Sequence, residues 1–254
     1  MSPPDVRGKI RNLAQRLRTP KVRVGTHTPV FLICRDRVAP LSQLVYWLEA
    51  EGFENLVLVD NDSTYPPLLE FYEETPHRVV RLGRNVGHHS PWLPELAAIR
   101  GDRDAYVVSD PDVIPEPLAG GAVQRFADLL NRYPGYAKAG FGLRIDDLPD
   151  RYAHRDAVLR WEAEAWQREV EPGVFHAPID TTFALYRAGA GFSLGPALRT
   201  GAPFLAKHEP WYRVDAHTDE ELTYYYARAQ SSDATWRPDA KDDMYDDRSG
   251  SGQG

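Results

Sequence analysis

The first half of the chain alternates short apolar runs with longer segments whose apolar residues recur at helical spacing. The apolar runs have the length of buried strands and cover residues 30–34, 56–59, 78–82 and 105–109. The helical spacing covers residues 41–52, 66–74 and 94–100. Strands that are apolar throughout and alternate with helices are typical of a parallel sheet with helices on both faces. The pattern therefore predicts a single α/β domain with a mostly parallel, Rossmann-like central sheet.

The pattern is less regular in the second half of the chain. It predicts helices at residues 120–133, 154–169 and 220–229, and strands at residues 136–143, 181–186 and 204–208. Before the first strand, residues 1–28 are basic, and residues 5–23 have the spacing of an amphipathic helix. From residue 239 to residue 254 the chain is acidic and rich in Gly and Ser, which predicts a disordered tail.

The overall composition is that of a globular protein in water. The 254 residues have a formal net charge of -7, which argues against a nucleic-acid backbone as the main partner. The single cysteine, Cys34, permits no internal disulfide and fits a reducing compartment. The N-terminus lacks the apolar segment of a secretory signal, and no apolar run reaches the ~20 residues that a membrane span needs. We therefore expect a cytoplasmic protein. Its basic N-terminal segment would either pack on the domain as a solvated helix or make peripheral contact with a membrane.

Polar clusters follow all four strands predicted in the first half. These clusters are Arg35-Asp36, Asp60-Asn61-Asp62, Arg84-Asn85 and Asp110-Pro111-Asp112. The carboxyl ends of parallel strands meet at one edge of a sheet, and ligands of such sheets bind outside that edge. The coincidence of four polar clusters at this edge is a stronger indication of a binding site than any one cluster.

The two carboxylates of Asp110 and Asp112 flank a proline directly after a predicted buried strand. Residues at this spacing can both turn toward one ligand. Two hard oxygen donors of this kind suit Mg²⁺ or Mn²⁺ shared with a diphosphate. The alternative is an ordinary acidic turn at the surface, because Asp and Pro are common turn residues.

The order of these features resembles the GT-A glycosyltransferases, most closely their family 2 branch. The resemblance rests on Asp60 after the second strand, on Arg84-Asn85-Val86-Gly87 after the third and on the D-x-D after the fourth. It covers residues 29–143 in order and continues more loosely to about residue 226. It implies a nucleotide-sugar-binding half at residues 29–143 and an acceptor-binding half at residues 144–238.

The resemblance also implies roles for individual residues. Asp60 would contact the base or ribose of the donor, and Asp112, with Asp110 beside it, would hold Mn²⁺ or Mg²⁺ on the diphosphate. His208 is the best match to the histidine that often completes this metal shell. Together with the polar residues at the other strand ends, the predicted donor-binding set is Arg35, Asp60, Arg84, Asn85 and Asp110. The Glu-Asp pair that often marks the catalytic base is not plainly present after residue 150, and Asp180 is the substitute that we predict.

The sequence thus predicts a metal-dependent glycosyltransferase that moves a sugar from a UDP-sugar or related donor to a hydroxyl group, with inversion. The acceptor would be a glycan, a lipid-linked glycan or a small molecule. One alternative is a nucleotidyltransferase on a related sheet, although residues 34–37 lack the glycine of a phosphate loop. Another is a non-catalytic sugar- or nucleotide-binding module, which would keep Asp60 but need no base.

Overall fold

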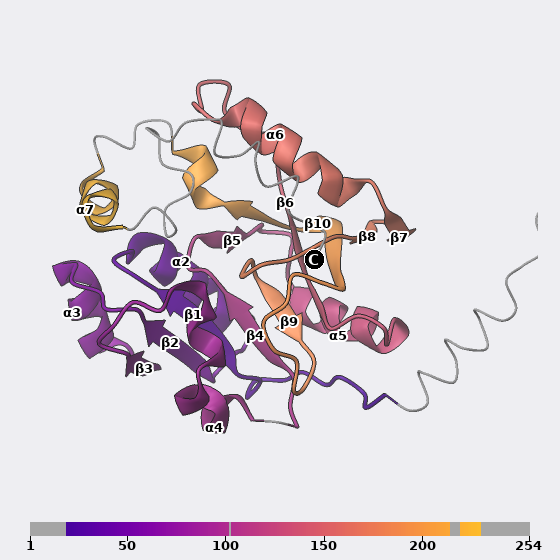
Figure 1. Cartoon of the computed structure of the whole chain (residues 1–254), viewed down its shortest axis with the longest axis horizontal. Helices are drawn as coiled ribbons and strands as arrows, with labels where there is room; N and C mark the ends of the chain where they lie inside the picture. The colour runs from indigo at the N-terminus through magenta and orange to yellow at the C-terminus, as the bar shows by residue number, and fades with distance from the viewer. Residues whose placement is uncertain (1–18, 102, 214–218, 230–254) are drawn as a thin grey trace, which may run out of the picture.

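One ten-stranded sheet runs through both halves of the chain (Figure 1). The computed structural model describes residues 19–101, 103–213 and 219–229. The strands lie in the order β3-β2-β1-β4-β9-β6-β10-β8-β7, and β5 pairs with β10 outside this path. Because both halves contribute strands to the same sheet, the chain forms a single α/β domain with helices around an open, largely parallel sheet. The fold class predicted from the sequence is confirmed.

The first half supplies the all-parallel part of the sheet. Its strands are β1 (Val30–Cys34), β2 (Leu56–Asp60), β3 (Arg78–Arg81) and β4 (Tyr106–Ser109). Every residue of β1, β2 and β4 is buried, which is why these strands are apolar throughout. β3 lies at the edge of the sheet, and its two terminal arginines, Arg78 and Arg81, are exposed.

Helices cover both faces of this parallel part. The helical elements are α2 (Ala39–Ala50), α3 (Pro66–Glu74), η1 (Gly87–Trp92), η2 (Pro94–Leu96) and α4 (Ala97–Arg100). Both α2 and α3 have a proline in their first turn, where its missing N–H would have no helical partner anyway. The helix predicted at residues 94–100 is divided into η2 and α4, and η1 was not predicted from the sequence.

The second half adds mixed pairing. Its elements are β5 (Val113–Pro115), α5 (Ala122–Arg132), β6 (Lys138–Leu143), α6 (Arg155–Ala163), η3 (Glu164–Trp166), β7 (Glu169–Glu171), β8 (Val174–His176), β9 (Ala184–Tyr186), β10 (Ala197–His208), η4 (Glu209–Tyr212) and α7 (Glu220–Arg228). β9 lies antiparallel between β4 and β6, whereas β10 runs parallel to β6. β10 is longer than the strand predicted at residues 204–208. The short strands β5, β7 and β8 were not predicted, whereas β9, which is also three residues long, lies within the strand predicted at residues 181–186.

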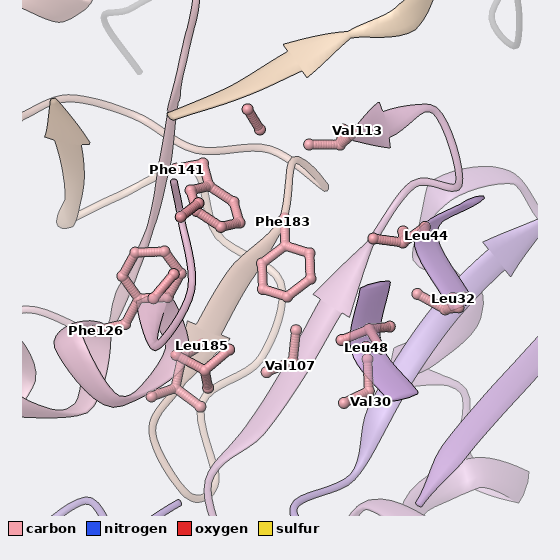
Figure 2. Packing of buried hydrophobic residues seen from close by; sticks show 14 of the residues in the cluster. Val30, Leu32, Leu44, Leu48, Val107, Val113, Phe126, Phe141, Phe183 and Leu185 are labelled. Carbon is pink, nitrogen blue, oxygen red and sulfur yellow. The ribbon is translucent and has the colours of Figure 1, made fainter. Parts of the chain in front are cut away.

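Side chains of successive strand residues enter two different cores. Val30 and Leu32 belong to a cluster with α2, α3 and α5, in which Phe126, Phe141 and Phe183 are completely buried (Figure 2). The alternate residues of β1, with Leu96 of η2, belong to a second cluster on the opposite face. This arrangement explains the continuous apolar runs, since a strand covered on both faces has no solvent-exposed side chains.

The N-terminal segment packs against α5, and the last helix folds back onto the first half. Residues 19–29 contain no helix, and Val22 exchanges two hydrogen bonds of 2.8 Å with the side chain of Asn131. α7 lies beside α2 and α3 (Figure 1), where Tyr224 packs against Tyr65 with ring centroids 4.9 Å apart. Most of the helix predicted at residues 5–23 and the whole predicted tail at residues 239–254 lie outside the described residues. No helix in the described ranges is long and apolar enough to cross a membrane.

The close contact between β6 and β9 leaves no room for a side chain at Gly140. A Cβ atom at this position would lie 2.3 Å from the carbonyl oxygen of Phe183 and 2.9 Å from Cα of Ala184. Backbone atoms in the middle of a sheet cannot move aside cheaply. We therefore expect Gly140→Ala to lower the free energy of unfolding by about 1–3 kcal/mol in urea titrations. The control is Gly135→Ala, where a Cβ would meet nothing within 4 Å. Equal stability of the two variants would contradict this packing.

Candidate active site at the carboxyl edge of the sheet

Asp60 ends β2 and organises the turn that follows it. Its side chain is buried, and Oδ1 accepts hydrogen bonds from the amide of Ser63 (3.1 Å) and the hydroxyl of Tyr72 (3.2 Å). Oδ2 lies 3.4 Å from Nε of Arg81 on the neighbouring strand. The carboxylate that the resemblance assigns to the nucleoside therefore also holds the connection between β2 and α3.

Asn61 forms hydrogen bonds to three other residues at the same edge. The sequence analysis named it as part of a polar cluster but gave it no role of its own. Its Oδ1 accepts from the amide of Val86 (3.2 Å), and its Nδ2 donates to Oγ of Ser90 (3.2 Å). Its carbonyl oxygen accepts from Nη1 of Arg35 (2.9 Å). Asn61 thus links the ends of β1 and β2 to the loop after β3. Its position between two aspartates at a strand end was the available signal.

Arg84 and Asn85 lie on that loop. Nη2 of Arg84 donates to Oε1 of Glu95 at 2.7 Å, and this arginine side chain is 57% exposed. Oδ1 of Asn85 accepts from the amide of Gly87 and so shapes the loop itself. A donor-binding role for these two residues stays a prediction.

Asp110 joins the end of β4 to the segment that precedes β9. Its amide donates to the carbonyl oxygen of Thr181 at 3.0 Å, and its Oδ2 accepts from Oγ1 of Thr181 at 2.6 Å. Burial and the neighbouring charges of Asp112 and Asp180 raise the pKa of Asp110 well above its usual value. Three carboxyl groups from two distant parts of the sequence therefore lie close enough to interact.

Asp112 faces His208 across the β5–β10 pair. Val113 is paired with His208, and the amide of Glu209 donates to the carbonyl oxygen of Asp112 at 2.8 Å. Oδ1 of Asp112 lies 3.8 Å from Nε2 of His208, which is too far for a hydrogen bond. Within the described residues, neither this Oδ1 nor Nδ1 of His208 has a hydrogen-bond partner, although both atoms are buried.

These two side chains fit a divalent cation. A buried carboxylate oxygen without a partner is costly, and a metal ion would satisfy it. A separation of 3.8 Å is within reach of two ligands that each bind one ion at about 2.0–2.2 Å. The described residues contain no ready group of three or more His, Cys, Asp or Glu side chains that could hold a metal. The remaining ligands would be donor phosphate oxygens and water, as is usual for Mg²⁺ sites.

Asp180 lies at the surface beside this pair. Its Oδ1 accepts from the amide (3.0 Å) and the hydroxyl (2.6 Å) of Thr182. Crowding by the protein would raise the pKa of Asp180, but the hydrogen bonds from Thr182 and the charges of Arg199 and His208 outweigh it and lower the pKa. The group is therefore a carboxylate that stays ionised near neutral pH.

A buried ionic network supports the site from the side of α7. Arg37 donates from Nη2 to Glu209 (2.8 Å) and from Nε to Glu221 (2.9 Å). The other oxygen of Glu221 accepts from the amide of Ala39 at the start of α2. Burial alone would lower the pKa of Arg37, but the charges of Glu209, Asp112 and Glu221 raise it. Sequence reasoning missed this network, since its members are 172 and 184 residues apart.

A scan against protein-family models and a search of curated proteins both return no match. The structure brings together four of the predicted site residues, Asp110, Asp112, Asp180 and His208, by the contacts and charge interactions described above. It places Asp60 and Arg35 in a second group around Asn61 at the same edge, and Arg84 at the surface.

The hydrogen bonds of Asp60 predict a structural cost for its removal. Asp60→Ala leaves the buried amide of Ser63 and the hydroxyl of Tyr72 without their acceptor, so we expect unfolding free energy to fall by about 1–3 kcal/mol. Asp60→Asn keeps an oxygen at the Oδ1 position and should lose less. Thermal and urea unfolding of both variants measure this difference. A variant Asp60→Ala as stable as the wild type would show that these hydrogen bonds contribute nothing.

Proposed function

We propose that this protein is a metal-dependent glycosyltransferase, which moves a sugar from a nucleotide-diphosphate donor to a hydroxyl group of an acceptor. The observation that supports this most is Oδ1 of Asp112, which is buried, has no hydrogen-bond partner among the described residues and lies 3.8 Å from Nε2 of His208. The carboxyl groups of Asp110 and Asp180 lie beside this pair. These residues gather at the carboxyl edge of a parallel sheet, where the ligands of such sheets bind.

The proposed donor site extends from the ends of β1 and β2 to the end of β4. Asp60, whose carboxylate is buried, would support the nucleoside site through the turn that it holds after β2. Arg35, fixed by its bond to Asn61, would add a positive charge beside the donor. The diphosphate would lie near Asp112 and His208. A divalent cation held there would offset the negative charge that develops on the leaving nucleoside diphosphate.

Asp180 is proposed to act as the base. The acceptor hydroxyl must lose a proton as it attacks, and an ionised carboxylate is able to take it. Asp180 suits this role because it is exposed, lies close to His208, and is oriented by its hydrogen bonds from Thr182. Its lowered pKa keeps it in the proton-accepting form, although it also makes the carboxylate a weaker base.

The expected donor is a UDP-sugar, and the expected acceptor is a glycan, a lipid-linked glycan or a small molecule. A cytoplasmic location and peripheral membrane contact through residues 1–28 belong to the same proposal. A nucleotide-binding module without catalysis is the alternative to test. It would bind the donor through the first half of the chain but would have no use for an oriented base at Asp180.

Replacing Asp112 tests the metal. Asp112→Ala removes a carboxylate whose Oδ1 has no partner among the described side chains, so we expect it to lower metal-dependent donor turnover at least ~100-fold. Calorimetric titration with Mn²⁺ in the presence of UDP should show a matching loss of affinity. The control is Asp128→Ala, an exposed carboxylate on α5 that bonds only Gln124 in the described structure. Wild-type turnover and Mn²⁺ affinity in Asp112→Ala would refute the metal assignment.

Replacing Asp180 tests the base. Asp180→Asn keeps an oxygen for the bonds from Thr182 but cannot accept a proton, so kcat should fall by roughly 10²–10⁴ while donor affinity is preserved. The melting temperature should stay near that of the wild type. A variant that melts earlier but keeps its kcat per folded molecule would instead assign Asp180 a purely structural role.

A further inference from the structure

Two buried cationic side chains contact the backbone of residues 178–180, the segment that ends in Asp180. Lys138, the first residue of β6, is 1% exposed, and its Nζ donates to the carbonyl oxygens of Ile179 (2.5 Å) and Asp180 (3.2 Å). Arg199 of β10 donates from Nε to the carbonyl oxygen of Pro178 at 2.8 Å. Three consecutive carbonyl groups, at residues 178–180, are therefore held by buried positive charges. The backbone of each residue from 178 to 180 is thus held by a buried side chain.

The two cations differ in how their charge is balanced. Arg199 forms an ion pair of 2.5 Å with Glu162, and both side chains are buried. Lys138 has no carboxylate within ion-pair distance among the described residues. Its charge is balanced by carbonyl dipoles, by the ring of Tyr186 at 4.7 Å and by the field of Asp180. Burial is the main reason that the pKa of Lys138 falls to about 8, and the charge of Asp180 opposes this shift.

Tyr186 extends the contact between Lys138 and Asp180. Its hydroxyl oxygen accepts from Nζ of Lys138 at 3.1 Å, and the hydroxyl donates to the carbonyl oxygen of Asp180 at 3.1 Å. A buried ammonium group without a carboxylate partner is expensive, and an apolar side chain would fill the same space at no electrostatic cost. The unfavourable free energy of burying Lys138 is explained if its charge is needed to hold the backbone of Ile179 and Asp180 in place.

From this geometry we infer that Lys138 is a positioning residue for the base of the proposed glycosyltransferase. It fixes the backbone at Ile179 and Asp180 and, with Tyr186, keeps the Asp180 carboxylate in its place beside Asp110 and His208. Lys138 touches neither donor nor acceptor in this arrangement. This inference rests on the proposed function, which assigns the base to Asp180.

The test compares Lys138→Met with a matched control. Arg187→Met removes a cation that also donates to backbone carbonyls, those of Tyr136 and Leu130, but at the opposite end of β9 from Asp180. We expect Lys138→Met to lower kcat about 10- to 100-fold, because small displacements of a catalytic group have effects of this size. The affinity for UDP with Mn²⁺, measured by calorimetry, should stay within about twofold of the wild type. Arg187→Met should keep its kcat.

A double-mutant cycle separates positioning from general stability. If Lys138 acts through Asp180, adding Lys138→Met to Asp180→Asn should lower kcat less than about twofold further. Fully additive losses would overturn the inference. Tyr186→Phe keeps the ring, removes only the hydroxyl and gives a milder test, with a smaller loss of kcat, should Lys138→Met fail to fold.

A measurement without turnover keeps the two proposals apart. The amide of Thr182 donates to the Asp180 carboxylate, so its hydrogen-exchange rate in NMR spectra reports whether that carboxylate is held. Exchange should become at least about tenfold faster in Lys138→Met, or in Tyr186→Phe, and stay unchanged in Arg187→Met. Unchanged exchange in the first two variants overturns the inference even if the protein is a glycosyltransferase. Lack of turnover in the wild type, with faster exchange in Lys138→Met, rejects the proposed function and leaves the positioning of Asp180 established.

Discussion

The antiparallel placement of β9 beside β4 is the constraint on which the candidate site depends. Val108 is paired with Ala184, so β9 runs away from the carboxyl end of β4 and the residues just before β9 lie at that end. The amide of Asp110 therefore donates to the carbonyl oxygen of Thr181, and Asp180, the preceding residue, lies at the same end of β4. A parallel β9 would have put Asp180 at the opposite edge of the sheet.

β10 adds the histidine by the same logic. β6 is antiparallel to β9, and β10 is parallel to β6, so the carboxyl end of β10 lies at the same edge as that of β4. Its last residue, His208, is paired with Val113, which places the imidazole opposite Asp112. The ionic network of Arg37 with Glu209 and Glu221 then fixes the residue after His208 to the first half of the chain.

The site gathers negative charge, and buried cations of the fold offset it. Burial, together with the charges of Asp112 and Asp180, raises the pKa of Asp110. Arg37 is close enough to Asp112 for that charge to raise its own pKa, and Arg199 lowers the pKa of Asp180. Because charges are costly inside a protein unless they are balanced, these cations and carboxylates depend on one another.

Local patterns fixed the elements of the first half. β1 spans Val30–Cys34, the same residues as the predicted apolar run, and β2 and β4 differ from prediction by one residue. The polar clusters after these strands were recognisable because parallel strands share an edge. The sequence pattern did not predict some elements that are short or that pair with strands far away in the sequence. β5 has three residues and pairs with β10, so no neighbour in the sequence indicates it.

The sequence by itself determined the fold class and named candidate residues for a metal site and a base. It could do so because hydrophobic periodicity and strand-end polarity are recorded in neighbouring residues. Only the tertiary structure decided which of them meet. Thr181 reaches Asp110 over 71 residues, and Lys138 reaches Ile179 over 41 residues. A charged residue such as Lys138 is expected from the sequence to be exposed to solvent, yet Lys138 is buried. The contacts that make its burial tolerable come from strands and segments that no local pattern brings together.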